Sequence, residues 1–185
     1  VFSEREDIYF LQEGVYSSEE SLNSNTKNIN PKLVVNENNK YYVYVGISKN
    51  LEVIKKIKNI YDKYLGGILP IKKEVNTEKV FNEKLKYSSS SVYLDGVKLE
   101  VTSNYLVPSL REGMVVFIGN KEGYGNTVII EDLDGIYNWY GNIDNTSLKL
   151  YDYVDKGTLV GEVNNTLYLV FSKGDKYLNY EEYLK

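Results

Sequence analysis

The sequence predicts an α+β protein of two modules, a mixed α/β module followed by an all-β module. The best amphipathic helix pattern covers residues 51–65 and lies among short runs rich in branched and aromatic residues. From residue 92 onward the chain consists of short strand-like runs separated by turns that contain glycine. A serine-rich stretch lies between the two halves and has the composition of a linker.

The first module shows strand and helix patterns in the order β-α-β-β-α-β. Strands are expected over residues 8–16, 32–36, 41–48 and 68–75, and helices over residues 17–29 and 51–65. Ser17 is expected to cap the first helix, because Glu20 follows it three residues later. This order is that of a split βαβ unit, so residues 5–76 are predicted to form a ferredoxin-like βαββαβ domain.

A short motif in the first strand points to a family. The strand carries Gln12, Gly14, Tyr16 and Ser18 in the pattern QxGxYxS, and VYVG follows over residues 43–46. With the helix after it, this pattern resembles the sporulation-related repeat (SPOR) family of peptidoglycan-binding domains. The resemblance implies a sheet whose exposed face binds glycan strands stripped of their stem peptides.

Three side chains are candidates for such glycan binding. Tyr42 and Tyr44 alternate with Val43 and Val45, so the two tyrosines are expected on one face together with Gln12. Aromatic rings pack on the C–H faces of sugars, and amides or phenols bond the hydroxyls. The alternative is that these tyrosines cover a solvated sheet or form a protein interface.

Residues 77–91 are predicted to link the modules, and residues 92–185 to form the second domain. A short helix is expected over residues 78–87, and the serines of residues 88–91 are expected to be flexible. The strand patterns beyond them indicate a compact antiparallel β-sandwich. Pro108 is expected in a loop, and residues 149–156 in one long connection.

Composition excludes several classes of site. The chain has no Cys and no His, so disulfides, thiolate metal sites and a histidine general base are impossible. A net charge of −4 without a basic cluster argues against a nucleic-acid partner. The chain holds 19 Tyr against 5 Phe, which reflects either an AT-rich genome or a surface that uses phenol rings.

The run from Glu112 to Gly161 resembles the sheet of LytM/lysostaphin-type zinc endopeptidases. It contains GYGNTVII, a DG turn, WYGN and VDKGTLVG in the order of that family. The resemblance implies a zinc ion held by two His and one Asp, with further His beside the bound water. None of those His is present in this chain.

The positions that match the family's ligands hold other residues. Leu94 and Lys98 replace the His and Asp of the HxGxD motif, Asn142 replaces the His of YxH, and residues 166–168 replace HxH with Tyr168 last. We therefore expect no catalytic residue, no metal and no cofactor. Leu94, Lys98, Asn142 and Tyr168 are predicted to line a degenerate active-site groove that serves as a binding surface. Glu131, Asp132 and Asp134 form an acidic turn, which is expected to be solvated rather than to bind calcium.

The last 75 residues resemble the C-terminal domain of the stage IV sporulation protein FA family, above all in KLYDYVDKG after WYGN. That resemblance implies an extracytoplasmic scaffold in the forespore intermembrane space, anchored by an upstream transmembrane helix. Its implied partners are membrane-embedded sporulation proteins, either an intramembrane protease complex or a forespore channel component, besides peptidoglycan glycan strands. Two alternatives stay open: a cell-wall hydrolase with an unrecognised site, and a purely oligomerising protein related to stage II sporulation protein Q.

Overall fold

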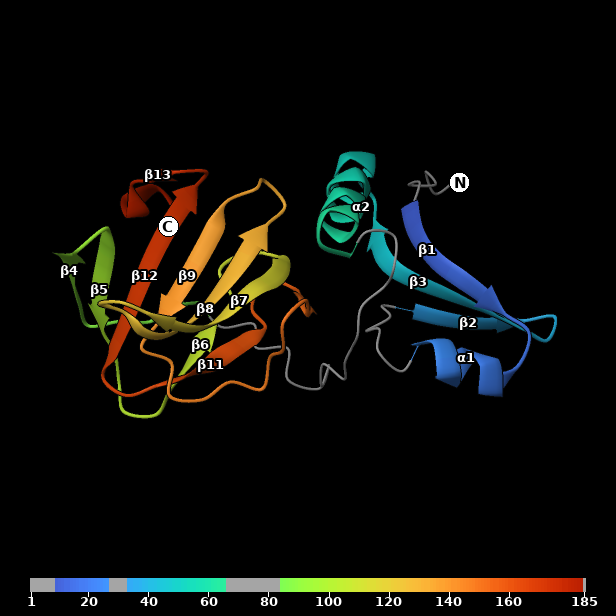
Figure 1. The fold of residues 1–185 in the computed structure, drawn as a ribbon, viewed down its shortest axis with the longest axis horizontal. Coiled ribbons are helices and arrows are strands. Elements are labelled where there is room, and N and C mark those ends of the chain that lie inside the picture. Colours follow the sequence, from blue (N-terminus) through green and yellow to red (C-terminus); the bar gives the residue numbers. More distant parts are fainter. Residues whose placement is uncertain (1–8, 27–32, 66–83, 185) are drawn as a thin grey trace, which may run out of the picture. The chain divides into compact units, whose positions relative to one another are not determined.

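The computed structural model describes residues 9–26, 33–65 and 84–184. The chain divides into two compact units, residues 1–74 and residues 75–185. The first unit contains a small sheet and two helices, and the second is mostly β (Figure 1). Among the described helices, none combines the length and the apolar character needed to cross a membrane.

The described residues of the N-terminal unit form a three-stranded antiparallel sheet with the order β1-β3-β2, together with two helices. Its elements are β1 (Tyr9–Tyr16), α1 (Glu19–Thr26), β2 (Leu33–Glu37), β3 (Lys40–Ser48) and α2 (Leu51–Leu65). A two-residue turn joins β2 to β3, with Asn38 at φ 53° and Asn39 at φ 62°. Asparagine tolerates this left-handed backbone, which matches the twist of a tight hairpin.

Helix α2 packs on β1 and β3 and supplies most of the buried apolar side chains among the described residues of this unit (Figure 1). Val43 and Val45 of β3 are buried together with Ile54, Ile57, Ile60 and Tyr61 of α2. Helix α1 begins after Ser18, whose Oγ accepts the Ser21 N–H at 3.0 Å, so the capping residue is Ser18 and not Ser17. The predicted fourth strand lies outside the described residues, and the ferredoxin-like domain stays a prediction.

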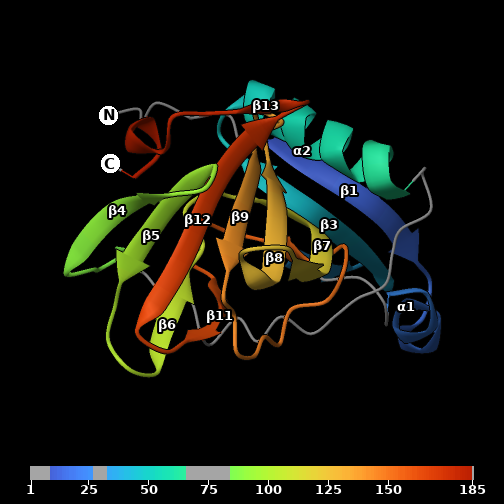
Figure 2. The ribbon, with the colours of Figure 1, turned by 60° about the vertical axis from the view of Figure 1, so that its left-hand side comes forward.

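The C-terminal unit consists of a large antiparallel sheet and a two-stranded ribbon. The large sheet has the order β10-β7-β8-β9-β12-β5-β4 with β13 beside β12, and the ribbon pairs β11 with β6 (Figure 2). The strands are β4 (Ser89–Tyr93), β5 (Gly96–Glu100), β6 (Tyr105–Pro108), β7 (Gly113–Lys121), β8 (Gly125–Asp132), β9 (Tyr137–Gly141), β10 (Tyr153–Val154), β11 (Leu159–Val163), β12 (Thr166–Lys173) and β13 (Lys176–Tyr177). A 3-10 turn, η2 (Tyr180–Glu182), follows them.

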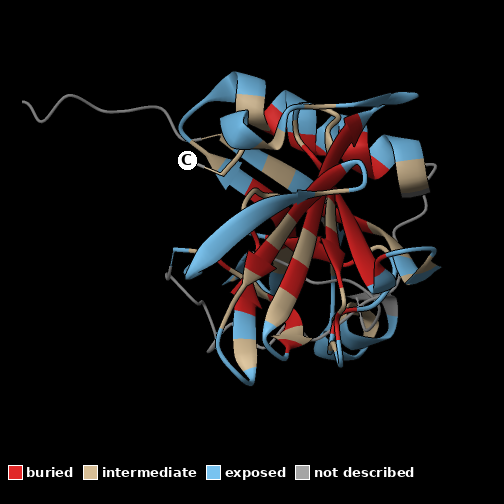
Figure 3. Ribbon diagram, turned by 90° about the vertical axis from the view of Figure 1, so that its left-hand side faces the viewer, coloured by how far each residue is buried: buried red, intermediate tan, exposed pale blue. Residues whose placement is uncertain are grey.

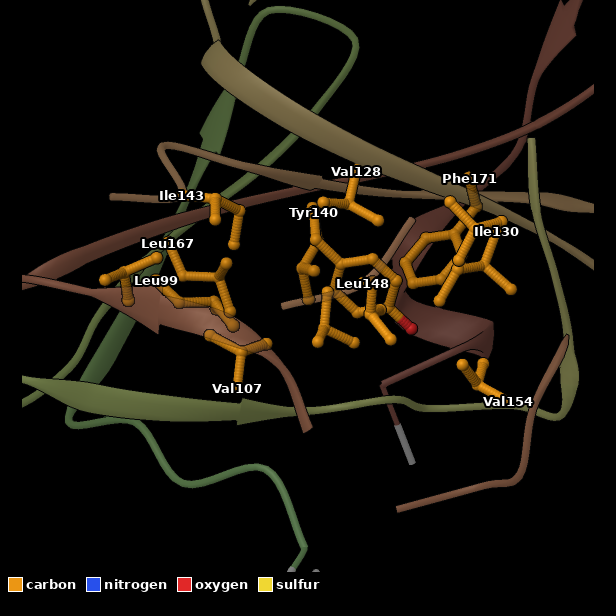
Figure 4. Packing of buried hydrophobic residues seen from close by; sticks show 14 of the residues in the cluster. Leu99, Val107, Val128, Ile130, Tyr140, Ile143, Leu148, Val154, Leu167 and Phe171 are labelled. Atoms are coloured by element: carbon orange, nitrogen blue, oxygen red, sulfur yellow. The ribbon is translucent and has the colours of Figure 1, made fainter. Parts of the chain in front are cut away.

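The hydrophobic core lies between the large sheet and the ribbon, and Figure 4 shows its packing. Alternate residues of β12 belong to it, namely Leu167, Leu169 and Phe171. Figure 3 shows that the buried residues concentrate on the long central strands. We call the opposite side of the large sheet its outer face.

Three expectations for the C-terminal part of the chain are wrong. Residues 89–91 are not flexible, because they form β4 and pair with β5. Pro108 ends strand β6, opposite Leu159 of β11. The connection 149–156 contains β10, which adds an edge to the sheet beside β7. Strands β6 and β10 pair with strands distant in sequence, and β4 pairs with β5 across a two-residue turn. Local composition reveals none of these pairings. No helix forms over residues 84–87, and residues 78–83 lie outside the described ranges.

Candidate functional site

Five aromatic side chains gather on the outer face of the large sheet. We call them the aromatic cluster: Tyr93, Tyr124, Trp139, Tyr168 and Tyr177. Tyr168 alternates with the buried Leu167 and Leu169, which turns its ring outward. Trp139 alternates in the same way with Asn138 and Tyr140.

The rings of the aromatic cluster contact one another closely. Tyr93 and Tyr168 stack with centroids 4.4 Å apart and planes 17° apart. Tyr124 meets both edge-on, at 5.8 Å and 6.0 Å, and meets Trp139 at 5.9 Å. These are the offset-stacked and edge-to-face geometries that aromatic pairs prefer. Tyr177 lies further out, 6.2 Å from Trp139.

Two turns are joined at the aromatic cluster by hydrogen bonds. The Tyr93 hydroxyl donates to the Gly123 carbonyl at 2.6 Å, and the Asp95 N–H donates to the Tyr124 hydroxyl at 3.0 Å. Burial raises the pKa of Tyr124, and it also raises the pKa of Tyr168, to which the neighbouring Tyr93 adds. Both shifts favour the neutral phenol, which can donate and accept hydrogen bonds.

The aromatic cluster covers apolar residues that would otherwise be exposed. Ile129 and Val170 are the cross-strand neighbours of Trp139 on the outer face, and both are buried. The Lys121 ammonium lies 5.2 Å from the Trp139 ring and 4.5 Å from the Phe117 ring, within cation–π range. The outer face is thus an aromatic surface with a cation at one side.

The four predicted groove residues each make their own local contacts. Lys98 and Tyr168 lie directly opposite each other across β5 and β12. Asn142 donates from Nδ2 to the Thr166 carbonyl at 2.8 Å and holds φ 67°, so it fixes the end of β9. Leu94 occupies the turn between β4 and β5 at φ 48°, and its side chain reaches Gly123 instead.

The donor atoms at these positions do not fit a zinc ion. Leu94 offers none, and the Lys98 ammonium is positively charged and lies 3.5 Å from Glu100. The Tyr168 ring is engaged with Tyr93. Within the described part of the chain, no group of three metal-ligating side chains lies together.

The predicted glycan-binding residues lie on one face of the N-terminal sheet. Gln12 of β1 is exposed and opposite Tyr44 of β3, and Tyr42 is two residues along the same strand. The register is irregular at Gln12, where the strand bulges. Phe10, which the sequence did not single out, joins this face with its ring 5.1 Å from Tyr44.

The acidic turn at the end of β8 is solvated only at Asp134, whereas the expectation fails for the other two carboxylates. Glu131 and Asp132 are both buried. Asp132 Oδ1 accepts the N–H groups of Asp134 and Ile136 at 2.9 Å and 3.0 Å, and its Oδ2 accepts from Asn138 at 3.1 Å. The carboxylate therefore shapes the turn by capping its backbone donors.

Sequence comparison places part of this chain among known proteins. Residues 93–183 match the model of Peptidase family M23. Over 91 residues the chain is 32% identical to stage IV sporulation protein FA of Bacillus subtilis (strain 168), an alignment that covers 46% of this chain and 34% of that protein. The chain thus spans about a third of the length of this curated relative.

Solved structures of M23 proteins are similar to this chain. A putative peptidase M23 from Pseudomonas aeruginosa aligns over 94% of both chains with a TM-score of 0.50 and 13% identity, a likeness of fold alone. The catalytic domain of lysostaphin from Staphylococcus simulans aligns over 48% of this chain and 77% of its own, with a TM-score of 0.44 and 20% identity. The family match and the sequence relative together support an M23-type (LytM-type) assignment for the C-terminal part of the chain, residues 93–183.

Proposed function

We propose that this chain is a non-catalytic, extracytoplasmic scaffold that regulates spore formation, and that its M23-type domain binds protein instead of cleaving peptide. The observation that carries the proposal is the aromatic cluster, in which Tyr168 stands at a family ligand position and stacks on Tyr93 at 4.4 Å. A zinc peptidase needs an open coordination position with a polarised water there. A packed phenol ring leaves room for neither.

The chemistry of the chain supports the same proposal. With no His and no Cys in 185 residues, the remaining donors for a metal are carboxylates, amides and phenols. Two of the family ligand positions hold Leu94 and Lys98. An ammonium at such a position repels a dication instead of binding it.

A protein partner suits the outer face better than a small molecule does. Interfaces between proteins are enriched in Tyr and Trp, because these side chains bury large area at little entropic cost and keep a polar tip. Trp139, Tyr168 and Tyr93 are each partly exposed on this face, and Tyr177 is exposed. The similarity to stage IV sporulation protein FA supports membrane-embedded sporulation proteins as the partners. An upstream membrane anchor and the forespore intermembrane space belong to the same proposal.

Catalysis is tested with the purified chain on peptidoglycan sacculi, with and without added zinc. We expect no release of soluble muropeptides in either case, since the ligand positions cannot hold the ion. An active M23 peptidase serves as the control for the assay. Release by this chain would refute the scaffold and favour a cell-wall hydrolase with an unrecognised site.

Partner binding is tested by photo-crosslinking from the outer face in sporulating cells. A photoreactive residue at Lys121 is expected to capture a membrane protein, whereas the same residue at Lys149, an exposed position in the connection after β9, is the control. Capture only of a second copy of the chain would favour the purely oligomerising alternative. Equal capture from both positions would remove the outer face as the interface.

The N-terminal unit is proposed to bind peptidoglycan glycan through Gln12, Tyr42 and Tyr44. Support comes from the placement of Gln12 opposite Tyr44 and from the Phe10 ring beside it, which together offer an amide and two rings on one face. Residues 1–185 are tested for retention on glycan strands with and without stem peptides. We expect the chain to be retained only on strands without stem peptides. Tyr44→Ala should lose this retention and Tyr41→Ala should keep it. Equal retention of the two variants would refute the proposed binding face.

A further inference from the structure

A second concave site lies apart from the aromatic cluster. It is a cleft of about 1000 Å³ bounded by the segment between β6 and β7, the turn after β8, the turn before β11 and the segment after η2. None of the five aromatic cluster residues lines it. Its walls combine apolar side chains with charges of both signs, so it is suited to a small polar ligand rather than to a hydrophobic one.

The side chain of Arg111, which lines this cleft, is held in place by several contacts. Its guanidinium lies over the Tyr183 ring at 4.7 Å and near the Phe171 ring at 5.9 Å. These two rings stack on each other at 4.9 Å, so the surface beneath the guanidinium is rigid. Asp132 lies 3.9 Å from Arg111 Nε and is itself held by backbone N–H groups. Ring stacking and the carboxylate together fix the plane and direction of the guanidinium.

The backbone that carries Arg111 is also held in place. The Arg111 carbonyl accepts from the Ser109 hydroxyl at 2.6 Å, and the Leu110 N–H donates to the buried Tyr140 hydroxyl at 2.9 Å. The Gly157 N–H donates to the Ser109 carbonyl at 2.8 Å. A preorganised donor of this kind loses little entropy when a ligand binds.

The hydrogen-bonding capacity of Arg111 is not used within the described residues. A guanidinium has five N–H donors, and a 3.9 Å approach to Asp132 is an ion pair rather than a hydrogen bond. Nη1 is buried without a hydrogen-bond partner among those residues. The side chain as a whole keeps 30% of its surface exposed, and Arg111 is one of the residues that line the cleft. An acceptor with two oxygens is the group that such a fork matches.

The other charged residues that line the cleft restrict the class of ligand that it can bind. Lys84 and Lys156 add positive charge to the lining, while Glu112 and Asp134 add negative charge. This balance disfavours a dianion such as phosphate and favours a single carboxylate next to N–H or ammonium groups. We propose that the Arg111 cleft binds the α-carboxylate of an amino acid or of a peptide terminus, with the carboxylate on Arg111 and the nitrogen end towards Asp134.

The proposal does not depend on the scaffold function, and its test uses the whole chain with trialanine as the probe. Backbone amide shifts in NMR spectra are followed as trialanine, trialanine amide, free alanine or inorganic phosphate is added to about 10 mM, which covers millimolar dissociation constants. We expect trialanine to shift the amides of residues 110–112 and 134, and the amide-capped peptide to shift none of them. If free alanine binds as tightly as trialanine, a single amino acid is sufficient as the ligand. If free alanine binds more weakly than trialanine, the ligand is a peptide terminus.

Variants of Arg111 test whether its guanidinium is the group that binds trialanine. Arg111→Gln is expected to weaken trialanine binding at least tenfold, and Arg111→Lys, which keeps the charge and much of the packing, is expected to weaken it as well because the fork is lost. Lys121→Gln removes a cation from the outer face and is the matched control, with unchanged binding. The proposal is overturned by equal binding of the acid and the capped peptide, by tighter binding of phosphate, by full binding in Arg111→Lys, or by no shift at all.

Discussion

Replacement of Tyr168 by Ala tests whether the aromatic cluster holds the outer face together. The variant loses the stack on Tyr93 at 4.4 Å and the edge contact with Tyr124 at 6.0 Å. Each aromatic pair contributes about 0.5–1.5 kcal/mol beyond its area, so two pairs give a loss of about 1–3 kcal/mol. Tyr177→Ala is the matched control, because Tyr177 is 52% exposed and makes a single edge contact with Trp139. Its expected cost is at most about 1 kcal/mol.

Urea unfolding followed by tryptophan fluorescence measures this difference directly. Trp139 is the only tryptophan of the chain and belongs to the aromatic cluster, so its signal reports on the C-terminal unit alone. With a slope of about 1–3 kcal/mol per molar urea, a loss of 2 kcal/mol lowers the midpoint by about 1 M. Tyr168→Phe keeps both ring contacts and is expected to stay close to the parent chain. Equal midpoints for the alanine variants of Tyr168 and Tyr177 would show that the stack does not stabilise the domain.

Three further substitutions test the core and its backbone. Gly96→Ala places a Cβ 2.0 Å from the Leu169 carbonyl oxygen, so we expect the C-terminal unit to lose its cooperative unfolding transition by circular dichroism. In Gly174→Ala the new Cβ meets no atom within 4 Å, but the residue sits at φ +59°, so the free energy of unfolding should fall by only about 1 kcal/mol. A comparable loss of stability in Gly96→Ala and Gly174→Ala would contradict the steric explanation. Burial raises the pKa of Tyr140 from 10.0 to about 12, so the folded chain stays protonated where the unfolded chain ionises. The contribution of Tyr140 to stability should therefore be constant below pH 10 and fall between pH 10 and 12 by up to about 3 kcal/mol. The Tyr140→Phe variant should lack this fall in stability above pH 10. At neutral pH it should be about 1–2 kcal/mol less stable than the parent chain, because the Leu110 N–H loses its acceptor. The same pH dependence in the variant and the parent chain would show that Tyr140 is not the group that titrates.

The sequence determined the elements whose signal is local. The helix over Leu51–Leu65 appears with the predicted bounds, because its apolar residues recur with the period of a helix and bury Ile54, Ile57 and Tyr61. The hairpin turn at Asn38 and Asn39 also has a local cause, since asparagine is one of the few residues that adopt its left-handed backbone. The motifs from Glu112 to Gly161 placed the M23-type domain in the C-terminal part of the chain.

Features that depend on strand pairing and burial escaped the sequence. The serines of β4 have weak strand propensity, and their strand exists because β5 offers a full set of hydrogen bonds. Asp132 looked solvated, yet it is buried because the turn after β8 supplies backbone donors to its carboxylate. Propensity acts within a few residues, whereas burial and strand pairing are decided by the whole fold.

The sequence by itself determined that this domain lacks the ligands of a zinc peptidase, because composition settles the absence of histidine in every conformation. Only the tertiary structure decided what takes their place. Tyr93, Tyr124 and Tyr168 come from three different strands or turns and meet because antiparallel pairing aligns them on one face. Arg111 in turn meets Tyr183 only because the chain returns to the sheet after η2. Contacts between residues this far apart are a property of the register and packing of the sheet, which no local pattern encodes.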